Sequence, residues 1–221
     1  MKLEPRTLQI LKNFASINPS LLFKPGNVIS TIAPLTKAVK AEATVDETFP
    51  SEFAIYDLSK LLAVISLFES PDIQINSNSL TVSQGSQSVD FRFADKNSIV
   101  APPDKKLTLP NPEIAFTLPA ATYHGIMKAL GVLQLPEIAV QGDQSGIYIA
   151  TVDSKNSSSN TYRVQVAETN GHTFDMIFRA DNLKVMNIDY EVQISSRGIS
   201  HFKGDGVEYW VATEANSKFQ Q

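Results

Sequence analysis

The chain has 221 residues, a formal net charge of −4 at pH 7, a 43% share of hydrophobic residues and no cysteine. This composition excludes disulfides, thiolate metal sites and cysteine nucleophiles, and it argues against global disorder. The longest apolar run is short and contains Lys60, and no signal peptide is evident at the start, so we expect a protein of the cytoplasm with no membrane span.

The first half of the chain predicts two helices, each followed by short strands. Residues 7–17 form the first helix, with one side made of Leu8, Leu11, Phe14 and Ala15, and strands follow at 21–23, 27–32 and 39–45. A short strand at 53–56 leads to Asp57, a good N-cap residue. The helix after it has the i, i+3, i+4, i+7 spacing of Leu58, Leu61, Leu62 and Ile65 and ends near Pro71; strands follow at 73–76, 80–83 and 89–94.

The second half repeats this order twice. A strand at 114–118 and Pro119 precede a helix whose apolar face is Tyr123, Ile126, Met127 and Leu130, and strands follow at 137–141, 146–152 and 161–167. A strand at 173–178, a short helical turn at 181–186 and strands at 190–195, 198–202 and 207–213 complete the chain. The pattern predicts an α+β fold of four helix-plus-strands units, in which pairs of units share a core because one copy cannot bury its helix face alone.

A proline-rich segment at 101–112 lies midway along the chain and is typical of an extended linker. We therefore expect one domain at 1–100, a linker at 101–112 and a second domain at 113–221, with two units in each domain. The repeated order of elements indicates an internal duplication. The alternative is a chance similarity between α+β segments.

Several short stretches resemble one known family. They are Leu11–Asn18, Ala54–Leu58, Val100–Pro102 and Tyr209–Ala215, and they occur in the same order over nearly the whole chain. On these stretches the chain resembles the sliding clamp subunit of T-even-type tailed phages, while 156–160 and much of the second domain match in pattern only. The resemblance implies the DNA-clamp fold and a homotrimeric ring with helices inside. Such a ring encircles duplex DNA and tethers the replicative polymerase, without catalytic residues or cofactors.

Basic residues on the predicted helices lie away from their apolar faces, whereas most acidic residues lie in strands, loops and helix ends. A protein with net negative charge needs this segregation if it is to bind phosphates. With the resemblance, we expect the DNA-facing residues to be Lys2, Arg6, Lys12, Lys60, His124, Lys128 and Lys184. The alternative is that these residues are ordinary side chains on solvated helix faces with no role in DNA binding.

Two alternating strands are candidates for the contacts between subunits. By resemblance, the strand with Val89, Phe91 and Phe93 and the strand with Tyr162, Val164 and Val166 meet across the subunit boundary. A ring would cover edges that otherwise risk uncontrolled pairing. The alternative is that both strands are internal.

The resemblance also implies an apolar pocket for partner peptides, between the domains and under the linker. The matching residues are Ile32, Leu35, Val39, Leu107, Leu109, Trp210, Ala212 and Ala215. The implied partners are the DNA polymerase and an ATP-driven clamp loader, and late-transcription proteins are further candidates for the pocket.

No pattern in the sequence indicates catalysis. The three histidines lack metal-ligand spacing, and no glycine-rich phosphate loop is present, so we expect a protein that is not an enzyme. A β-rich phage structural or assembly protein is the alternative function, and a small hydrolase with an unrecognised carboxylate pair is a more distant one. If the chain is encoded by a phage, the cytoplasm is that of the host cell.

Overall fold

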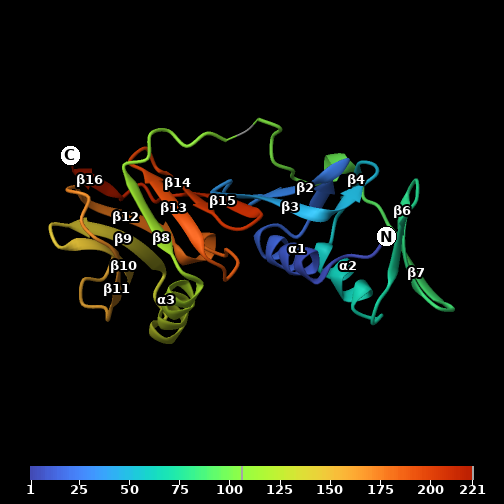
Figure 1. Ribbon diagram of the computed structural model, residues 1–221, viewed down its shortest axis with the longest axis horizontal. Helices are drawn as coiled ribbons and strands as arrows, with labels where there is room; N and C mark the ends of the chain where they lie inside the picture. The colour runs from blue at the N-terminus through green and yellow to red at the C-terminus, as the bar shows by residue number, and fades with distance from the viewer. Residues whose placement is uncertain (106, 221) are drawn as a thin grey trace. The chain divides into compact units, whose positions relative to one another are not determined.

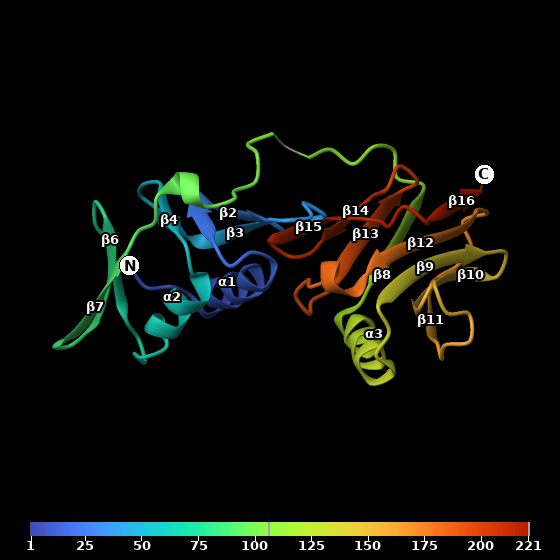
Figure 2. The ribbon, with the colours of Figure 1, turned by 180° about the vertical axis from the view of Figure 1, so that it is seen from behind.

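The computed structural model describes residues 1–105 and 107–220, and it separates into two compact units, Met1–Lys105 and Lys106–Gln221 (Figures 1 and 2). Each unit combines helices with antiparallel strands, so the predicted α+β class is confirmed. No helix in the described ranges is long and apolar enough to cross a membrane.

In the first unit, two helices, α1 (Pro5–Ile17) and α2 (Leu58–Ile65), pack against each other (Figure 1). Strand β1 (Leu21–Phe23) pairs with β4 (Phe53–Ile55), and β2 (Gly26–Ile32) pairs with β3 (Val39–Phe49). A three-stranded sheet has the order β5 (Asp72–Ile75), β6 (Ser79–Gln84), β7 (Gln87–Arg92), and a 3₁₀ turn, η1 (Lys96–Ser98), follows it.

Helix α2 matches its prediction. Leu58, Leu61, Leu62 and Ile65 are all buried, and the Asp57 carboxylate accepts a hydrogen bond from the backbone N–H of Lys60 at 2.8 Å. An aspartate in this role satisfies one of the unpaired amides of a helix N-terminus. On α1, Leu11 and Phe14 are buried as predicted, whereas Leu8 and Ala15 are only half-buried, and Thr7 and Ile10 complete the buried side instead. Helix α1 contacts β2 and β3 as well as α2. The side of the helix that these contacts bury therefore does not include Leu8 and Ala15.

The end of α1 is fixed by a buried asparagine. The Asn18 Nδ2 donates to the carbonyl oxygens of Ile32 at 3.1 Å and Val100 at 2.9 Å, and its Oδ1 accepts from the Ser20 N–H at 3.0 Å. These bonds attach α1 to the end of β2 and to the segment that leaves the first unit. Four phenylalanines, Phe23, Phe49, Phe53 and Phe93, form the aromatic cluster of this unit, with Phe53 stacked on Phe23 and on Phe93.

In the second unit, helix α3 (Ala120–Leu133) contacts one edge of a five-stranded sheet (Figure 2). That sheet has the order β11 (Tyr162–Ala167), β10 (Gly146–Val152), β9 (Glu137–Asp143), β12 (Thr173–Arg179), β16 (Lys218–Gln220). Four further strands pair in the order β15 (Val207–Ala212), β14 (Ile199–Lys203), β13 (Tyr190–Ser195), β8 (Ile114–Leu118).

The fourth predicted unit lacks a true helix. The helical turn expected at 181–186 is only a 3₁₀ turn, η2 (Ala180–Asn182), and Lys184 lies after it. The Tyr123 hydroxyl donates to the Leu183 carbonyl at 2.7 Å, and the Tyr190 hydroxyl donates to the Met186 carbonyl at 2.8 Å. The Met186 carbonyl also accepts from the Ile188 N–H at 3.0 Å, so the carbonyls after the turn find partners outside a helix. Burial raises the pKa of Tyr123 to about 12, so its hydroxyl remains a donor.

Candidate functional site

Exposed basic side chains gather on the helix pair of the first unit. Arg6 and Lys12 lie on exposed positions of α1, Lys60 lies on an exposed position of α2, and Lys2 is exposed just before α1. Each is off the buried face of its helix, because burial follows the 3.6-residue period and these residues fall between the apolar positions. Within this unit the structure brings the four predicted DNA-facing residues to one pair of packed helices.

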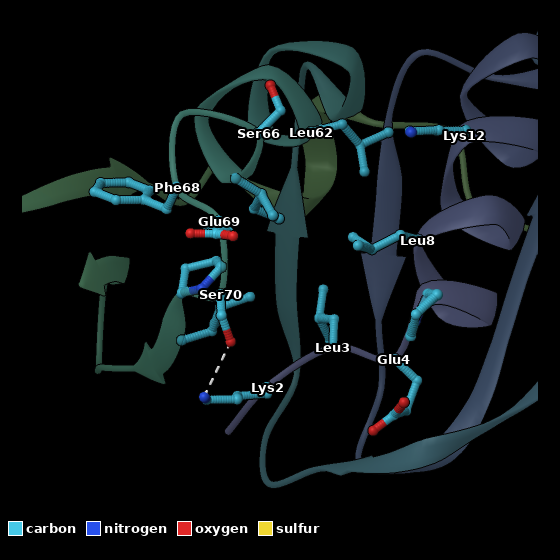
Figure 3. Close-up of a pocket in the computed structure, with 14 residues that line it drawn as sticks. Lys2, Leu3, Glu4, Leu8, Lys12, Leu62, Ser66, Phe68, Glu69 and Ser70 are labelled. Atoms are coloured by element: carbon cyan, nitrogen blue, oxygen red, sulfur yellow. Dashed lines mark hydrogen bonds between the residues drawn. The ribbon is translucent and has the colours of Figure 1, made fainter.

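The start of α1 borders a hollow of about 370 Å³ (Figure 3). Leu3, Leu8 and Leu62 line it, with Lys2 and Lys12 at its rim. The Lys2 ammonium donates to the Ser70 hydroxyl at 3.1 Å. Glu4 and Glu69 also line it, so the hollow combines apolar side chains with charges of both signs.

A buried glutamate of β3 replaces the missing side-chain cap of α1. Glu4 occupies the N-cap position but makes no capping bond with its own side chain. Instead, the Glu47 carboxylate accepts from the Glu4 N–H at 2.5 Å and from the Thr7 hydroxyl at 2.6 Å. An anion here satisfies one amide of the helix N-terminus and interacts favourably with the helix dipole, so Glu47 helps to hold the helix that carries Arg6 and Lys12.

In the second unit, His124 and Lys128 are exposed on α3, four residues apart and thus on the same face of the helix. Lys184 is also exposed, but it is not on a helix, contrary to the expectation from sequence. The three residues therefore reach the surface of the unit from α3 and from the irregular segment after η2.

The two strands expected between subunits both lie at sheet edges in the described part of the chain. Strand β7 is an outer strand of the sheet β5-β6-β7, and β11 is an outer strand of the five-stranded sheet. Val89, Phe91, Val164 and Val166 are half-buried, and Tyr162 is 37% exposed. Phe93 follows β7 and stacks on Phe53 at 4.8 Å between ring centroids, so it belongs to the aromatic cluster of its own unit.

An arginine on β11 is held in a network that no pattern in the sequence indicates. The Arg163 Nη2 donates to Asp143 Oδ2 at 3.0 Å, and its guanidinium carbon lies 3.5 Å from the centre of the Tyr148 ring. Ser145 donates to Asp143 through its hydroxyl and, at 2.8 Å, through its N–H. Together, first the Ser145 bonds and then Arg163 lower the pKa of Asp143 to about 2. No short-range pattern could reveal this network, because its members come from one turn and three strands.

The predicted partner-pocket residues belong to both units and differ in exposure. Ile32, Val39 and Trp210 are buried, and Trp210 stacks on His201 at 4.8 Å between ring centroids. Leu35 is 94% exposed at a turn, and the remaining members, Leu107, Leu109, Ala212 and Ala215, range from half-buried to exposed. Leu35 is therefore the member with the largest apolar surface open to a ligand in its own unit.

The described residues contain no group of three or more histidine, aspartate or glutamate side chains that could hold a metal ion. The residues that stand out are cationic side chains on helices and apolar residues on edge strands. Such an arrangement suits binding and assembly.

Comparison with known sequences identifies the family. The sequence pattern described as DNA polymerase processivity factor matches residues 2–101, and the pattern described as the C-terminal part of the gp45 sliding clamp matches residues 115–215. A sliding clamp of Vibrio phage KVP40 is 31% identical over 97% of this chain and 100% of the relative. The chain belongs to the sliding-clamp family. Sliding clamps of Escherichia phage RB69 and Enterobacteria phage T4 are 28% and 27% identical, each over 98% of both chains.

Solved structures show the same fold as this sliding clamp. Proliferating cellular nuclear antigen from Entamoeba histolytica has a TM-score of 0.70 at 12% identity, covering 94% of both chains. The A. fulgidus antigen, solved with the C-terminal region of FEN-1, has a TM-score of 0.68 at 14% identity over 96% of both. The Helicobacter pylori beta clamp has a TM-score of 0.67 at 12% identity over 98% of this chain and 66% of that one.

These comparisons confirm the resemblance seen in the sequence, the clamp fold and the function of a polymerase processivity factor. They do not favour the alternative of a β-rich structural protein. The family is one of non-catalytic processivity factors.

Proposed function

We propose that the clamp closes as a homotrimeric ring around duplex DNA, with Lys2, Arg6, Lys12, Lys60, His124, Lys128 and Lys184 facing the phosphates. The observation that carries this proposal is the exposure of all seven on or beside helices and turns of a chain whose net charge is −4. Contacts with phosphates carry no sequence information, and point charges on flexible side chains exchange readily between neighbouring phosphates. The closed ring would then keep the clamp on the DNA. The cations would lower the electrostatic energy of the DNA inside the ring.

The proposal also names the proteins that would bind the clamp. The replicative polymerase would bind by inserting apolar anchors against Ile32, Leu35, Val39, Leu107, Leu109, Trp210, Ala212 and Ala215, as short peptides do in apolar grooves. Leu35 supports this role because it is a large apolar side chain with almost full exposure. An ATP-driven loader would open the ring, late-transcription proteins would use the same pocket, and the protein would work in the host cytoplasm without catalysing a reaction. The two compact units would be the two clamp domains.

The ring is tested by the native mass of the particle. Light scattering at micromolar concentration should give three times the 24.2 kDa chain mass, and electron microscopy should show a central hole. A monomer, or a compact particle without a hole, would overturn the proposal.

The DNA-facing assignment is tested by changing Lys12, Lys60, Lys128 and Lys184 together to glutamine. We expect shorter polymerase products and a shallower salt dependence of DNA association, by a slope of roughly 0.9 for each lost phosphate contact. A matched control changes Lys37, Lys155, Lys203 and Lys218, which are exposed on turns, loops and strands. Equal losses in both variants, or none in the first while both remain trimeric, would refute the assignment.

A further inference from the structure

Helix α3 begins without a side-chain cap from its own N-cap residue. That residue is Pro119, whose side chain has no polar group that could bond the first amides of the helix. The Ala120 N–H instead donates to the Asp189 Oδ1 at 2.7 Å, although the two residues are 69 positions apart in the chain. Asp189 therefore caps a helix to which it does not belong, and its negative charge suits the positive end of the helix dipole.

A second contact ties the same turn of α3 to the irregular segment 183–189. The Tyr123 hydroxyl donates to the Leu183 carbonyl at 2.7 Å and, more weakly, to the Val185 carbonyl at 3.3 Å. Tyr123 is buried, so these bonds are shielded from water. Because Tyr123 and Ala120 both lie in the first turn of α3, the segment is held to that turn near its start by Tyr123 and at its end by Asp189.

The side chains at the start of the segment alternate between the core and the surface. Leu183 and Val185 are buried, and Leu183 borders the same small core cavity as Tyr123 and Ile126. Lys184 lies between these two buried residues and is exposed. The burial of its neighbours and the bonds to their carbonyls thus fix the backbone from which the lysine projects.

Two further tyrosines hold the middle of the segment. The Tyr190 hydroxyl donates to the Met186 carbonyl at 2.8 Å, and the Tyr209 hydroxyl accepts from the Met186 N–H at 3.3 Å. Burial raises the pKa of both phenols, so their hydroxyl groups stay protonated. The segment therefore has fixed backbone bonds although it forms neither helix nor strand.

The two ties between α3 and the segment depend on each other. Both start from one helical turn, and both end in one short segment. Once either bond has formed, only a short loop has to close for the other, so the entropic cost of the second closure is small. Contacts that share their elements in this way are coupled and do not act additively. Loss of either bond should therefore weaken both.

We propose that Tyr123 and Asp189 are positioning residues that join α3 and the segment 183–189 into one body. This inference rests on the DNA-facing role proposed above. The exposed basic side chains of the two elements then project from a single fixed backbone: His124 and Lys128 from α3, and Lys184 from the segment. A fixed backbone lowers the ordering cost of a contact with phosphates. The segment thereby takes the place of the helix that the fourth unit lacks.

Hydrogen exchange in the full chain tests the coupling. Tyr123→Phe removes the hydroxyl and keeps the ring, whereas Asp189→Ala removes the carboxylate. The two reporter amides are Ala120 on α3 and Met186 in the segment, both of which donate hydrogen bonds. Each variant should speed the exchange of both reporter amides by roughly tenfold, the effect of losing about one hydrogen bond. The double variant should give less than the product of the two single effects.

Matched variants separate these bonds from a general loosening of the unit. Asp189→Asn keeps an acceptor oxygen at the cap, and Tyr148→Phe removes a hydroxyl near the β9–β10 turn. Both should leave the two reporter amides exchanging at the natural rate. If Tyr123→Phe and Asp189→Ala each speed only the amide on their own side, in chains that remain folded, the ties are independent and the inference is overturned.

Association with duplex DNA separates a positioning role from a purely structural one. Tyr123→Phe keeps every charge, so the salt dependence of association should not change. The affinity should fall roughly threefold, because the segment must then become ordered when DNA binds. Lys184→Gln should instead make the salt slope shallower by about 0.9. In the Lys184→Gln background, Tyr123→Phe should lose its effect on affinity.

The outcomes separate this inference from the function proposed above. Coupled exchange, together with a Tyr123→Phe effect on affinity that depends on Lys184, supports the inference. An equal effect in both backgrounds, or no effect where Lys184→Gln weakens association, overturns the positioning role and leaves the DNA-facing role intact. If Lys184→Gln itself changes nothing, the DNA-facing role of Lys184 fails and the positioning role fails with it.

Discussion

Replacement of Glu47 by alanine probes how the first helix is anchored. The Glu47 carboxylate is buried and accepts bonds from the Glu4 N–H and the Thr7 hydroxyl. The substitution leaves both donors without their acceptor, but the consequences differ. Glu4 is exposed, so its N–H can bond to water, whereas Thr7 is 1% exposed and loses its partner inside the unit.

The expected loss of stability follows from these two donors. A buried donor left without a partner costs about 1–3 kcal/mol. Loss of a favourable charge at the N-terminus of a helix adds roughly 0.3–1 kcal/mol. We therefore expect Glu47→Ala to lower the free energy of unfolding by about 3 kcal/mol, and Glu47→Gln, which keeps one acceptor oxygen, to lower it by about half of that.

Urea denaturation at one fixed chain concentration measures this change, since assembly shifts apparent stability with concentration. Hydrogen exchange of the α1 amides reports whether the loss is local to the helix. In a Thr7→Val background, which removes the buried donor while keeping the shape, the effect of Glu47→Ala should shrink by about 1–2 kcal/mol. A loss below about 0.5 kcal/mol for Glu47→Ala, within the range of neutral surface changes, would refute this reasoning.

Two further predictions follow from the hydrogen bonds of Asp143 and Asn18. The Asp143 carboxyl should titrate with a midpoint of about 2 by NMR, and Ser145→Ala should move its pKa toward the ordinary 3.8, with a smaller move for Arg163→Gln. Because its pKa is lowered in the folded protein, the stabilising contribution of Asp143 is present above the ordinary pKa and is lost as the pH falls through about 2. An unchanged titration midpoint in Ser145→Ala would contradict the assignment of the shift to the Ser145 bonds. Asn18→Ala removes donors to the carbonyls of Ile32 and Val100 and should cost about 2–4 kcal/mol in urea unfolding, with faster exchange of the amides at 98–101. Retention of exchange protection there would show that Asn18 does not hold this segment.

Much of the fold could be predicted because the apolar periodicity of this chain is regular. Helix α2 shows the clearest case, since its cap and all its buried residues follow a local pattern. Strand β3 was predicted too short, because a charged residue, Glu47, occupies an inward position and interrupts the alternation up to Phe49. Strand β16 was missed because two of its three residues, Lys218 and Gln220, are polar and exposed, so no apolar run indicates a strand.

The fourth unit shows the limit of local reasoning. Its residues favour a longer helical turn, but the turn ends at Asn182, and the carbonyls of Leu183 and Met186 accept bonds from the hydroxyls of Tyr123 and Tyr190. The exposed helix positions of Lys12, Lys60 and Lys128 followed from the same periodicity that places the core. Their role toward DNA came from the family resemblance, and the bonds of Arg163 required the register of β10 and β11, which the sequence does not specify.

The arrangement of Arg163 on Tyr148 and Asp143 has a consequence for the rate of assembly. An arginine side chain that is free in solution loses roughly 1.5–2 kcal/mol of rotamer entropy when it is ordered at an interface. Asp143 and Tyr148 already order this arginine within its own unit, so in the ring proposed above little of that loss would remain for an encounter through β11. The same cation lies on an otherwise open strand, where a charge discourages pairing with unrelated strands. In the proposed ring, the same ordered arginine would favour association with the next subunit and discourage aggregation before it.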